Sequence, residues 1–325
     1  MTRRNWLGPL VGAALILAFA LPGPNARALD KIAGGTLGGQ APLWPIYIGI
    51  HKGVFAADGI DLSLTFAQSS PSAVQQLTAG SLDVLMSVGI TDPMIAISKG
   101  APLAIVRIIG EAAPYVLIAK SDIKSIKDLK GKTISAGTVS DIATYYIGRM
   151  MEANGLKKGD YELQSAGVAA ARFAALQAGV AQAAMVLPPL NFKAEKLGYP
   201  TIALASDYVH DFPFTCMAVY KPWAATHEDA LKRLLAATTK SMDWLYDPPN
   251  RQAAIDLLVS VAHADPTEAS ESFDLLKKIG YFERTGKVSR KQLQNLIDVE
   301  KSLGFIDQSF AADALIDPSI SAVTD

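Results

Sequence analysis

The residues of this chain that could bind or transform a small molecule lie in loops ahead of predicted helices. The first such loop, Gly38-Gly39-Gln40, precedes the apolar run Leu43–Ile50. This run predicts a short helix, and the N–H groups at a helix N-terminus are unpaired and carry positive dipole character. The loop could therefore hold a polar or anionic ligand. The same glycines would equally suit the turn of an ordinary first α/β unit, and this stretch alone leaves both interpretations open.

A catalytic or metal site is harder to build from the same sequence. Cys216 is the only cysteine, and the four histidines are scattered along the chain, at His51, His210, His227 and His263. None belongs to a recognisable nucleophile motif, whereas a hydrolase needs a base beside its nucleophile. Zinc sites need paired His or Cys spacings, which are missing. We therefore expect a protein that is not an enzyme and has no cofactor or metal.

Strands and helices alternate over the first two thirds of the chain, which predicts an α/β fold. After the strand 60–67, Ser70 is a good N-cap and Pro71 a good first helical residue. The strand 103–109 is apolar except for Arg107, which predicts burial on both faces. These loops and caps are the elements that would position polar groups for binding.

One stretch of the chain recurs 99 positions later. Leu77–Met86 matches Leu176–Met185, and each copy is a helix that ends in glycine, followed by a buried strand and a proline-led helix. The repeat predicts two equivalent βαβ lobes. The loops 89–92 and 187–189 would then lie at the carboxyl ends of parallel strands, where open α/β sheets bind ligands.

The chain becomes helical after the second lobe. Phe214–Tyr220 is expected to be a strand that returns to the first lobe. Four helices should follow it: His227–Tyr246, Asn250–Val261, Pro266–Ile279 and Ser289–Leu303. The polar residues from Asp317 onward are expected to be loose.

The amino terminus predicts export. Arg3 and Arg4 precede the apolar run Leu10–Leu21, and Ala26-Arg27-Ala28 matches a signal cleavage site. The run is short for a membrane anchor. A lipoprotein is not expected either, because it would need a cysteine near the cleavage point, and none is present there. Two export routes remain open, the general secretory one and the twin-arginine one, which Thr2–Leu7 resembles.

The charge of the mature chain excludes some partners. Removal of residues 1–28 lowers Lys and Arg from 30 to 27 against 31 Asp and Glu, which gives a net charge of about −4. Nucleic acids and anionic membranes require a basic face, so neither is expected as a partner. With Cys216 alone, no intrachain disulfide can form, and an exported chain must depend on its core.

Several motifs occur in order over roughly residues 32–205. They are Pro45–Gly49, Lys52–Phe55, Asp58–Asp61, Ala79–Val84, Ile126–Lys132 and Leu176–Gly179. Together they resemble the solute-binding proteins of ABC importers. The chain is most similar to the NMT1/THI5-like group, which includes sulfonate-, taurine-, nitrate- and thiamine-pyrimidine-binding proteins. The helical remainder is similar in character only.

The resemblance implies a two-lobed α/β periplasmic-binding-protein fold, type II-like, with two βαβ lobes, a cleft, two crossing segments and a helical C-terminal region. The crossings would lie near Ala112–Tyr115 and Phe212–Phe214. The implied divisions are a signal peptide at 1–28, lobe 1 at 29–113 plus 216–325, and lobe 2 at 114–215.

In such a fold the ligand lies between loops at helix N-termini from both lobes. Lobe 1 would contribute Gln40, Trp44, Ser69, Ser70, Gly89 and Thr91. Lobe 2 would contribute Thr138, Ser140, Gly167, Leu187 and Pro188, with Phe214 near the hinge. Some have a purely structural alternative, because Ser69 and Ser70 could only cap a helix, and Trp44 and Phe214 could belong to the core.

The expected cleft loops contain no Lys or Arg. They are 36–44, 67–72, 87–93, 137–141, 166–171 and 187–190. A nitrate or sulfonate site would be expected to contain a fixed cation or many polar donors, whereas backbone N–H groups can hold a carboxylate. With Leu37 and Trp44 as apolar wall, we expect a small organic solute, such as a partly apolar or aromatic carboxylate. Arg172, the nearest cation, is expected to be a solvated helix residue.

The resemblance also implies partners and a location. The chain would be a periplasmic monomer that serves an ABC permease in the inner membrane with its ATPase. A pyrimidine-synthase-like enzyme on the same fold is an alternative, although its cysteine-rich motif cannot be supplied by Cys216 alone. A periplasmic ligand sensor is another, and the sequence does not separate sensing from transport.

Overall fold

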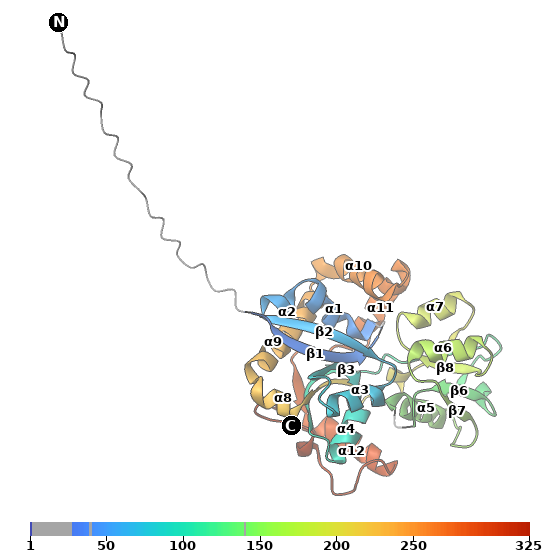
Figure 1. Cartoon of the computed structure of the whole chain (residues 1–325). Helices are drawn as coiled ribbons and strands as arrows, with labels where there is room; N and C mark the ends of the chain where they lie inside the picture. The colour runs from blue at the N-terminus through green and yellow to red at the C-terminus, as the bar shows by residue number, and fades with distance from the viewer. Residues whose placement is uncertain (2–27, 39–40, 140) are drawn as a thin grey trace.

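Two five-stranded mixed sheets, each flanked by helices, form the two lobes of the structure (Figure 1). The computed structural model describes Met1 and residues 28–38, 41–139 and 141–325. The body of the expected signal peptide, Gln40 and Ser140 therefore lie outside the described residues. The expected two-lobed α/β arrangement is confirmed.

The sheet of lobe 1 has the strand order β2-β1-β3-β10-β4. Its strands are β1 (Asp30–Leu37), β2 (Ile60–Ala67), β3 (Val84–Gly89), β4 (Leu103–Gly110) and β10 (Thr215–Tyr220). The first three are parallel, whereas β10 runs antiparallel to both β3 and β4. The returning strand is thus inserted between two strands of the lobe that the chain left earlier.

The sheet of lobe 2 repeats this plan with the order β7-β6-β8-β5-β9. Its strands are β5 (Val116–Ala119), β6 (Thr133–Ala136), β7 (Glu162–Ser165), β8 (Ala183–Val186) and β9 (Thr201–Leu204). Here β6, β7 and β8 are parallel, and the entering strand β5 is antiparallel to β8 and β9. The equivalent positions of β3 and β8 explain the recurring sequence stretch.

Helices cover both sheets and form the C-terminal region (Figure 1). Those of the lobes are α1 (Trp44–His51), α2 (Val54–Ala57), α3 (Ser70–Thr78), α4 (Thr91–Ser98), α5 (Ile142–Ala153), α6 (Ala169–Gln177) and α7 (Leu190–Lys196). The later ones are α8 (Lys221–Thr226), α9 (Glu228–Tyr246), α10 (Arg251–Ala262), α11 (Pro266–Lys278) and α12 (Arg290–Ser302). The N-cap of α3 is Ser69 rather than Ser70, because the Ser69 Oγ accepts a 3.3 Å bond from the Ser72 N–H.

The two crossing segments lie side by side, between β4 and β5 and between β9 and β10. The Phe214 N–H donates to the Gly110 oxygen at 2.7 Å, which joins one crossing to the other. Aromatic rings surround this point, with Tyr115 and Phe214 centroids 5.0 Å apart and Tyr146 and Tyr281 each 6.2 Å from Phe214. The hinge is therefore a packed aromatic cluster.

The end of the chain is ordered, contrary to the expectation of a loose tail from Asp317. Strand β12 (Ala322–Thr324) pairs in parallel with β11 (Lys287–Ser289). Next to it, the Ser321 Oγ donates to the Ile105 oxygen of β4 at 3.3 Å. The expectation of a loose tail was wrong because these partners are distant along the chain.

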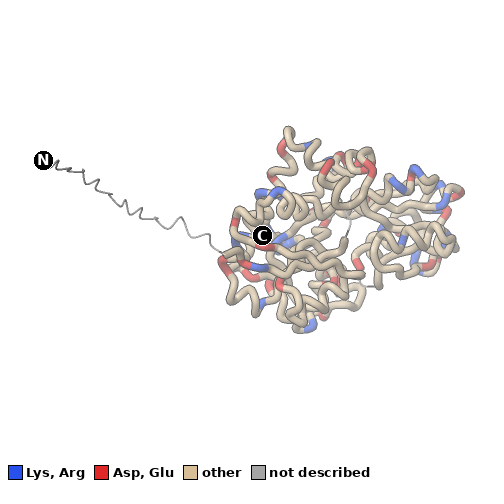
Figure 2. Tube along the Cα trace, turned by 45° about the horizontal axis from the view of Figure 1, so that its top comes forward, with Lys and Arg blue, Asp and Glu red and all other residues tan. Residues whose placement is uncertain are grey.

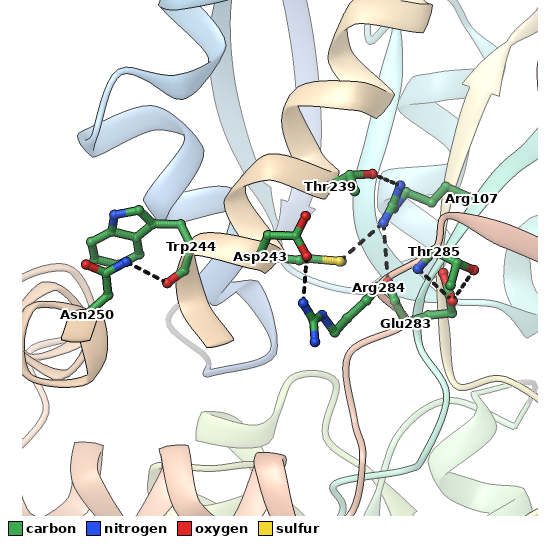
Figure 3. A network of polar contacts seen from close by, with 9 residues as sticks. Arg107, Thr239, Asp243, Trp244, Asn250, Glu283, Arg284 and Thr285 are labelled. Carbon is green, nitrogen blue, oxygen red and sulfur yellow. Dashed lines mark hydrogen bonds and ion pairs between the residues drawn. The ribbon is translucent and has the colours of Figure 1, made fainter. Parts of the chain in front are cut away.

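Arg107 is buried in β4 and ties the sheet to α9 (Figure 3). Its Nη1 donates to the Thr239 Oγ1 at 2.8 Å, and its Nη2 donates to the Glu283 backbone oxygen at 3.3 Å. Burial lowers the pKa of Arg107 to about 10, although Glu283 and Asp243 oppose this effect. The strand is buried on both faces, as expected.

Trp44 belongs to the core of lobe 1, so its assignment to the pocket wall is corrected. Its side chain is 0% exposed, its Nε1 donates to the Ala254 oxygen at 2.8 Å, and its ring meets Phe273 edge-on at 5.6 Å. Helix α1 thus holds Trp44 against α10 and α11, away from the space between the lobes.

Charged side chains of both signs are interspersed over the two lobes (Figure 2). Within 28–38, 41–139 and 141–325, no helix combines the length and the apolar character needed to cross a bilayer.

Replacing Trp44 with Phe should lower the free energy of unfolding by about 1–3 kcal/mol, because a buried hydrogen bond and some packing volume are lost. Urea unfolding measures this loss, and ligand affinity should stay unchanged. Trp223→Phe, at a half-buried ring stacked on His227, is the matched control and should change stability by less than about 0.5 kcal/mol. A loss of affinity in Trp44→Phe without loss of stability would return Trp44 to the site.

Candidate ligand-binding site

A cavity with two connected chambers lies between the lobes, beside the crossing segments. The first chamber has a cavity volume of about 40 Å³ and the second of about 30 Å³. Both are lined by five common residues, namely Leu37, Ser70, Tyr115, Asp141 and Leu187. The walls come from the loops after β1, β2, β3, β6, β7 and β8, which meet where parallel strands end.

Most of the residues expected in the site do line these chambers. Gly89, Thr91 and Phe214 line the first, Ser69, Thr138 and Gly167 line the second, and Ser70 and Leu187 line both. Trp44 lines neither, because it lies in the core. Pro188 also lies outside both linings, and it contributes its backbone oxygen to a contact between the lobes instead.

The lobes touch across the mouth of the cavity, as in a closed form. The Ala41 N–H of lobe 1 donates to the Pro188 oxygen of lobe 2 at 3.0 Å. Farther out, the Lys196 Nζ of α7 lies 2.9 Å from an Asp265 oxygen and 3.3 Å from a Glu268 oxygen of α11. At Gly167, whose φ of +69° favours glycine, an added Cβ would lie 3.4 Å from the Gln68 oxygen of the other lobe.

Arg172 is buried in the second chamber, which corrects the expectation of a solvated helix residue. It is 2% exposed, its Nη2 lies 2.9 Å from Asp141 Oδ2, and its Nε donates to the Gly167 oxygen at 2.7 Å. The guanidinium also lies over the Tyr115 ring, 5.6 Å from the centroid. Gly137 permits this arrangement, because an added Cβ would lie 2.1 Å from the Asp141 carboxylate.

The charge state of this pair follows from its surroundings. Burial alone would lower the pKa of Arg172, but the interactions with Tyr115 and Asp141 outweigh it, and the pKa is raised. Burial raises the pKa of Tyr115, so its hydroxyl keeps its proton at neutral pH. The second chamber therefore contains a permanent cation that a carboxylate already partly compensates.

Three polar atoms around the second chamber have no hydrogen-bond partner in the part of the chain that the structure describes. They are Ser70 Oγ, Thr138 Oγ1 and Arg172 Nη1. Buried polar groups are nearly always paired, so atoms of this kind are available to a ligand. Hydroxyl and guanidinium groups are donors that suit an acidic oxygen.

A family model described as NMT1/THI5 like matches residues 40–252 of the chain. The chain belongs to the NMT1/THI5-like family. This confirms the resemblance found in the motifs between residues 45 and 179. A comparison with curated proteins finds no match.

Solved structures share the fold of this NMT1/THI5-like chain. The alkanesulfonate-binding protein SsuA from Xanthomonas axonopodis pv. citri, bound to MOPS, is 16% identical with a TM-score of 0.73, over 92% of this chain and 100% of that one. The periplasmic nitrate-binding protein NrtA from Synechocystis PCC 6803 is 15% identical with a TM-score of 0.71, over 92% and 87%. A DszB mutant in complex with biphenyl-2-sulfinic acid is 14% identical with a TM-score of 0.63, over 89% and 98%.

Several lining residues were missed by the sequence argument. They are Pro42, Leu43, Pro71, Ser87, Asp92, Tyr115, Asp141, Ile142, Val168, Ala169, Arg172 and Thr215. Arg172, the single charged residue of helix α6, was the one usable signal. Within the described ranges, no group of three or more His, Cys, Asp or Glu side chains could hold a metal ion.

A buried carboxylate outside the chamber linings, that of Glu300, interacts electrostatically with Asp92. Glu300 of α12 is 2% exposed, and burial, together with the nearby charge of Asp92, raises its pKa to about 7. Asp92 itself lines the chamber. Ionised Glu300 therefore disfavours the folded state.

Stability should fall as the pH rises from about 4.5 to about 7, since the Glu300 pKa is raised on folding and unfolded Glu ionises first. Glu300→Gln removes this effect. The free energy of unfolding of the variant should therefore rise relative to that of the natural protein by about 2–3 kcal/mol between pH 4.5 and pH 7. Urea unfolding at several pH values measures the difference. Glu271→Gln, on an exposed face of α11, is the control. Parallel stability curves for Glu300→Gln and the natural protein would contradict the assignment.

Proposed function

We propose that the chain is the extracytoplasmic substrate-binding component of an ABC importer. It captures a small organic solute between its lobes and delivers it to a membrane permease in the inner membrane. The observation that carries the proposal is the cavity lined from both lobes while the lobes touch across its mouth. A ligand that bridges two lobes favours the closed form, which a partner can recognise.

The named relatives support this proposal. The alkanesulfonate-binding and nitrate-binding proteins have the same fold over most of their length. The apolar run and cleavage pattern in residues 1–28 support delivery to the periplasm through one of the two export routes. We keep the boundaries of lobe 1 at 29–113 plus 216–325 and of lobe 2 at 114–215, and propose that the protein acts as a monomer.

The lining favours a partly apolar organic carboxylate as the ligand. Leu37, Leu43, Val88 and Phe214 provide apolar surface, and Arg172 adds a cation at one end. Small-molecule sites commonly combine an apolar wall with a few polar groups.

An enzyme reaction through the lone cysteine is disfavoured by its surroundings. Cys216 is buried in β10, and burial raises the pKa of its thiol. A reactive cysteine needs thiolate character and access, and Cys216 has neither.

Purified mature protein, freed of retained ligand by unfolding and refolding, should be stabilised by small organic carboxylates. A carboxylate present at 100 times its Kd should add about 2.7 kcal/mol to the free energy of unfolding. Thermal shift detects the ligand, and small-angle scattering should show a smaller radius of gyration in its presence. Stabilisation by nitrate or taurine but by no aromatic or aliphatic carboxylate would refute the carboxylate assignment. Product turnover during the incubation would indicate an enzyme.

Lys196→Ala should weaken ligand binding by up to about fivefold, because the ion pairs of Lys196 join the lobes only when they are closed and are half exposed. The change should appear mainly in the dissociation rate, measured by stopped flow. Lys240→Ala is the control, since Lys240 pairs with Asp58 inside lobe 1. Equal affinities for Lys196→Ala and the natural protein would remove this contact from the closing mechanism.

A further inference from the structure

The two chambers of the cavity differ in charge. Asp141, which lines both chambers, forms an ion pair with Arg172 of the second chamber, so their charges partly compensate. The first chamber contains Asp92, which is 8% exposed, with Thr91 beside it. Asp92, Asp141 and Arg172 are the charged side chains among the described residues that line the two chambers, and together they leave one net negative charge.

A simple anion would fit this cavity poorly. Its acidic group would satisfy the unpartnered Arg172 Nη1, Ser70 Oγ and Thr138 Oγ1 at the second chamber. The remainder of the ligand would then extend into the first chamber, where Asp92 repels negative charge in surroundings of low dielectric constant. Glu300 interacts electrostatically with Asp92 and adds to this repulsion when it is ionised. A positively charged or hydrogen-donating group at the far end of the ligand would remove the conflict.

We infer that the cavity binds an amino carboxylate in a fixed direction, with its carboxylate at Ser70, Thr138 and Arg172 and its ammonium group at Asp92. This inference rests on the proposed function and adds to it the charge and the orientation of the ligand. Leu37 and Leu187 contact the apolar middle of the ligand, because both line the passage shared by the chambers.

Matched probes test the two ends separately. The panel consists of ω-amino carboxylates of increasing chain length and para-(aminomethyl)benzoate, each with its counterpart that lacks the amine, its counterpart that lacks the carboxylate, and its dicarboxylate. Isothermal titration should show at least tenfold tighter binding for one amino carboxylate than for all of its counterparts. Equal or tighter binding of the plain acid or the dicarboxylate would overturn the inference.

Variants identify which end each residue contacts. Arg172 also holds Gly167 and Asp141, so the hydroxyl variants Ser70→Ala and Thr138→Val are used. Each should weaken every carboxylate about tenfold while the ligand-free protein keeps or gains stability, because an unpaired buried hydroxyl is removed. Asp92→Asn should weaken the amino carboxylate about tenfold and leave or improve binding of the plain acid.

The controls lie outside the cavity. They are Ser98→Ala, whose hydroxyl donates to the Ile95 oxygen, and Asp298→Asn on the exposed face of α12. If a ligand binds and closes the lobes but Ser70→Ala, Thr138→Val and Asp92→Asn bind it as the natural protein does, the inference fails and the proposed function stands. If no small molecule stabilises or closes the protein, both fail.

Discussion

The structure depends on the point where the chain crosses twice between the lobes. The Gly110 oxygen and the Phe214 N–H join the crossings at 2.7 Å, and the rings of Tyr115, Tyr146 and Tyr281 pack around Phe214. Edge-to-face aromatic packing keeps this point rigid. The backbone hydrogen bond at the crossing does not extend into the loops on either side. The cavity lies directly beside it, since Tyr115 and Phe214 also form its wall. The junction of the two lobes is therefore packed directly beside the cavity.

Local signals were enough to predict the elements but not the burial of single side chains. Gly80 and Pro71 predicted helix ends, because capping and turn chemistry depend on near neighbours. The repeat predicted two equivalent βαβ lobes but not the order of strands in their sheets. The contacts of Trp44 are 210 positions away, at Ala254. Asp141 lies 31 positions from Arg172, so the local sequence predicted a solvated arginine in the first turn of the helix. Polar residues of the site were predicted where a loop caps a helix, as with Ser69. They were missed where their position in the site depends on contacts between segments that are distant along the chain.

The ion pair between Asp141 and Arg172 shows how the fold can place a charge that the cleft loops lack. A buried pair gains little net stability, because desolvation offsets much of the attraction. Here the pair has a positional effect: Asp141 also caps α5 through the Ala143 N–H at 2.8 Å, so the carboxylate is fixed by backbone on one side and orients the guanidinium on the other. The cation reaches the cavity from a helix rather than from a loop.

The insertion of β10 between β3 and β4 also has a consequence for biogenesis. Lobe 2 is one continuous piece of chain, from β5 to β9, and its sheet can be completed as soon as that piece has emerged. The sheet of lobe 1 lacks β10 until the chain has emerged as far as Tyr220. Until then, the edges of β3 and β4 that pair with β10 are exposed. When the chain emerges from its amino terminus, lobe 2 is therefore the first lobe whose strands are all available for pairing.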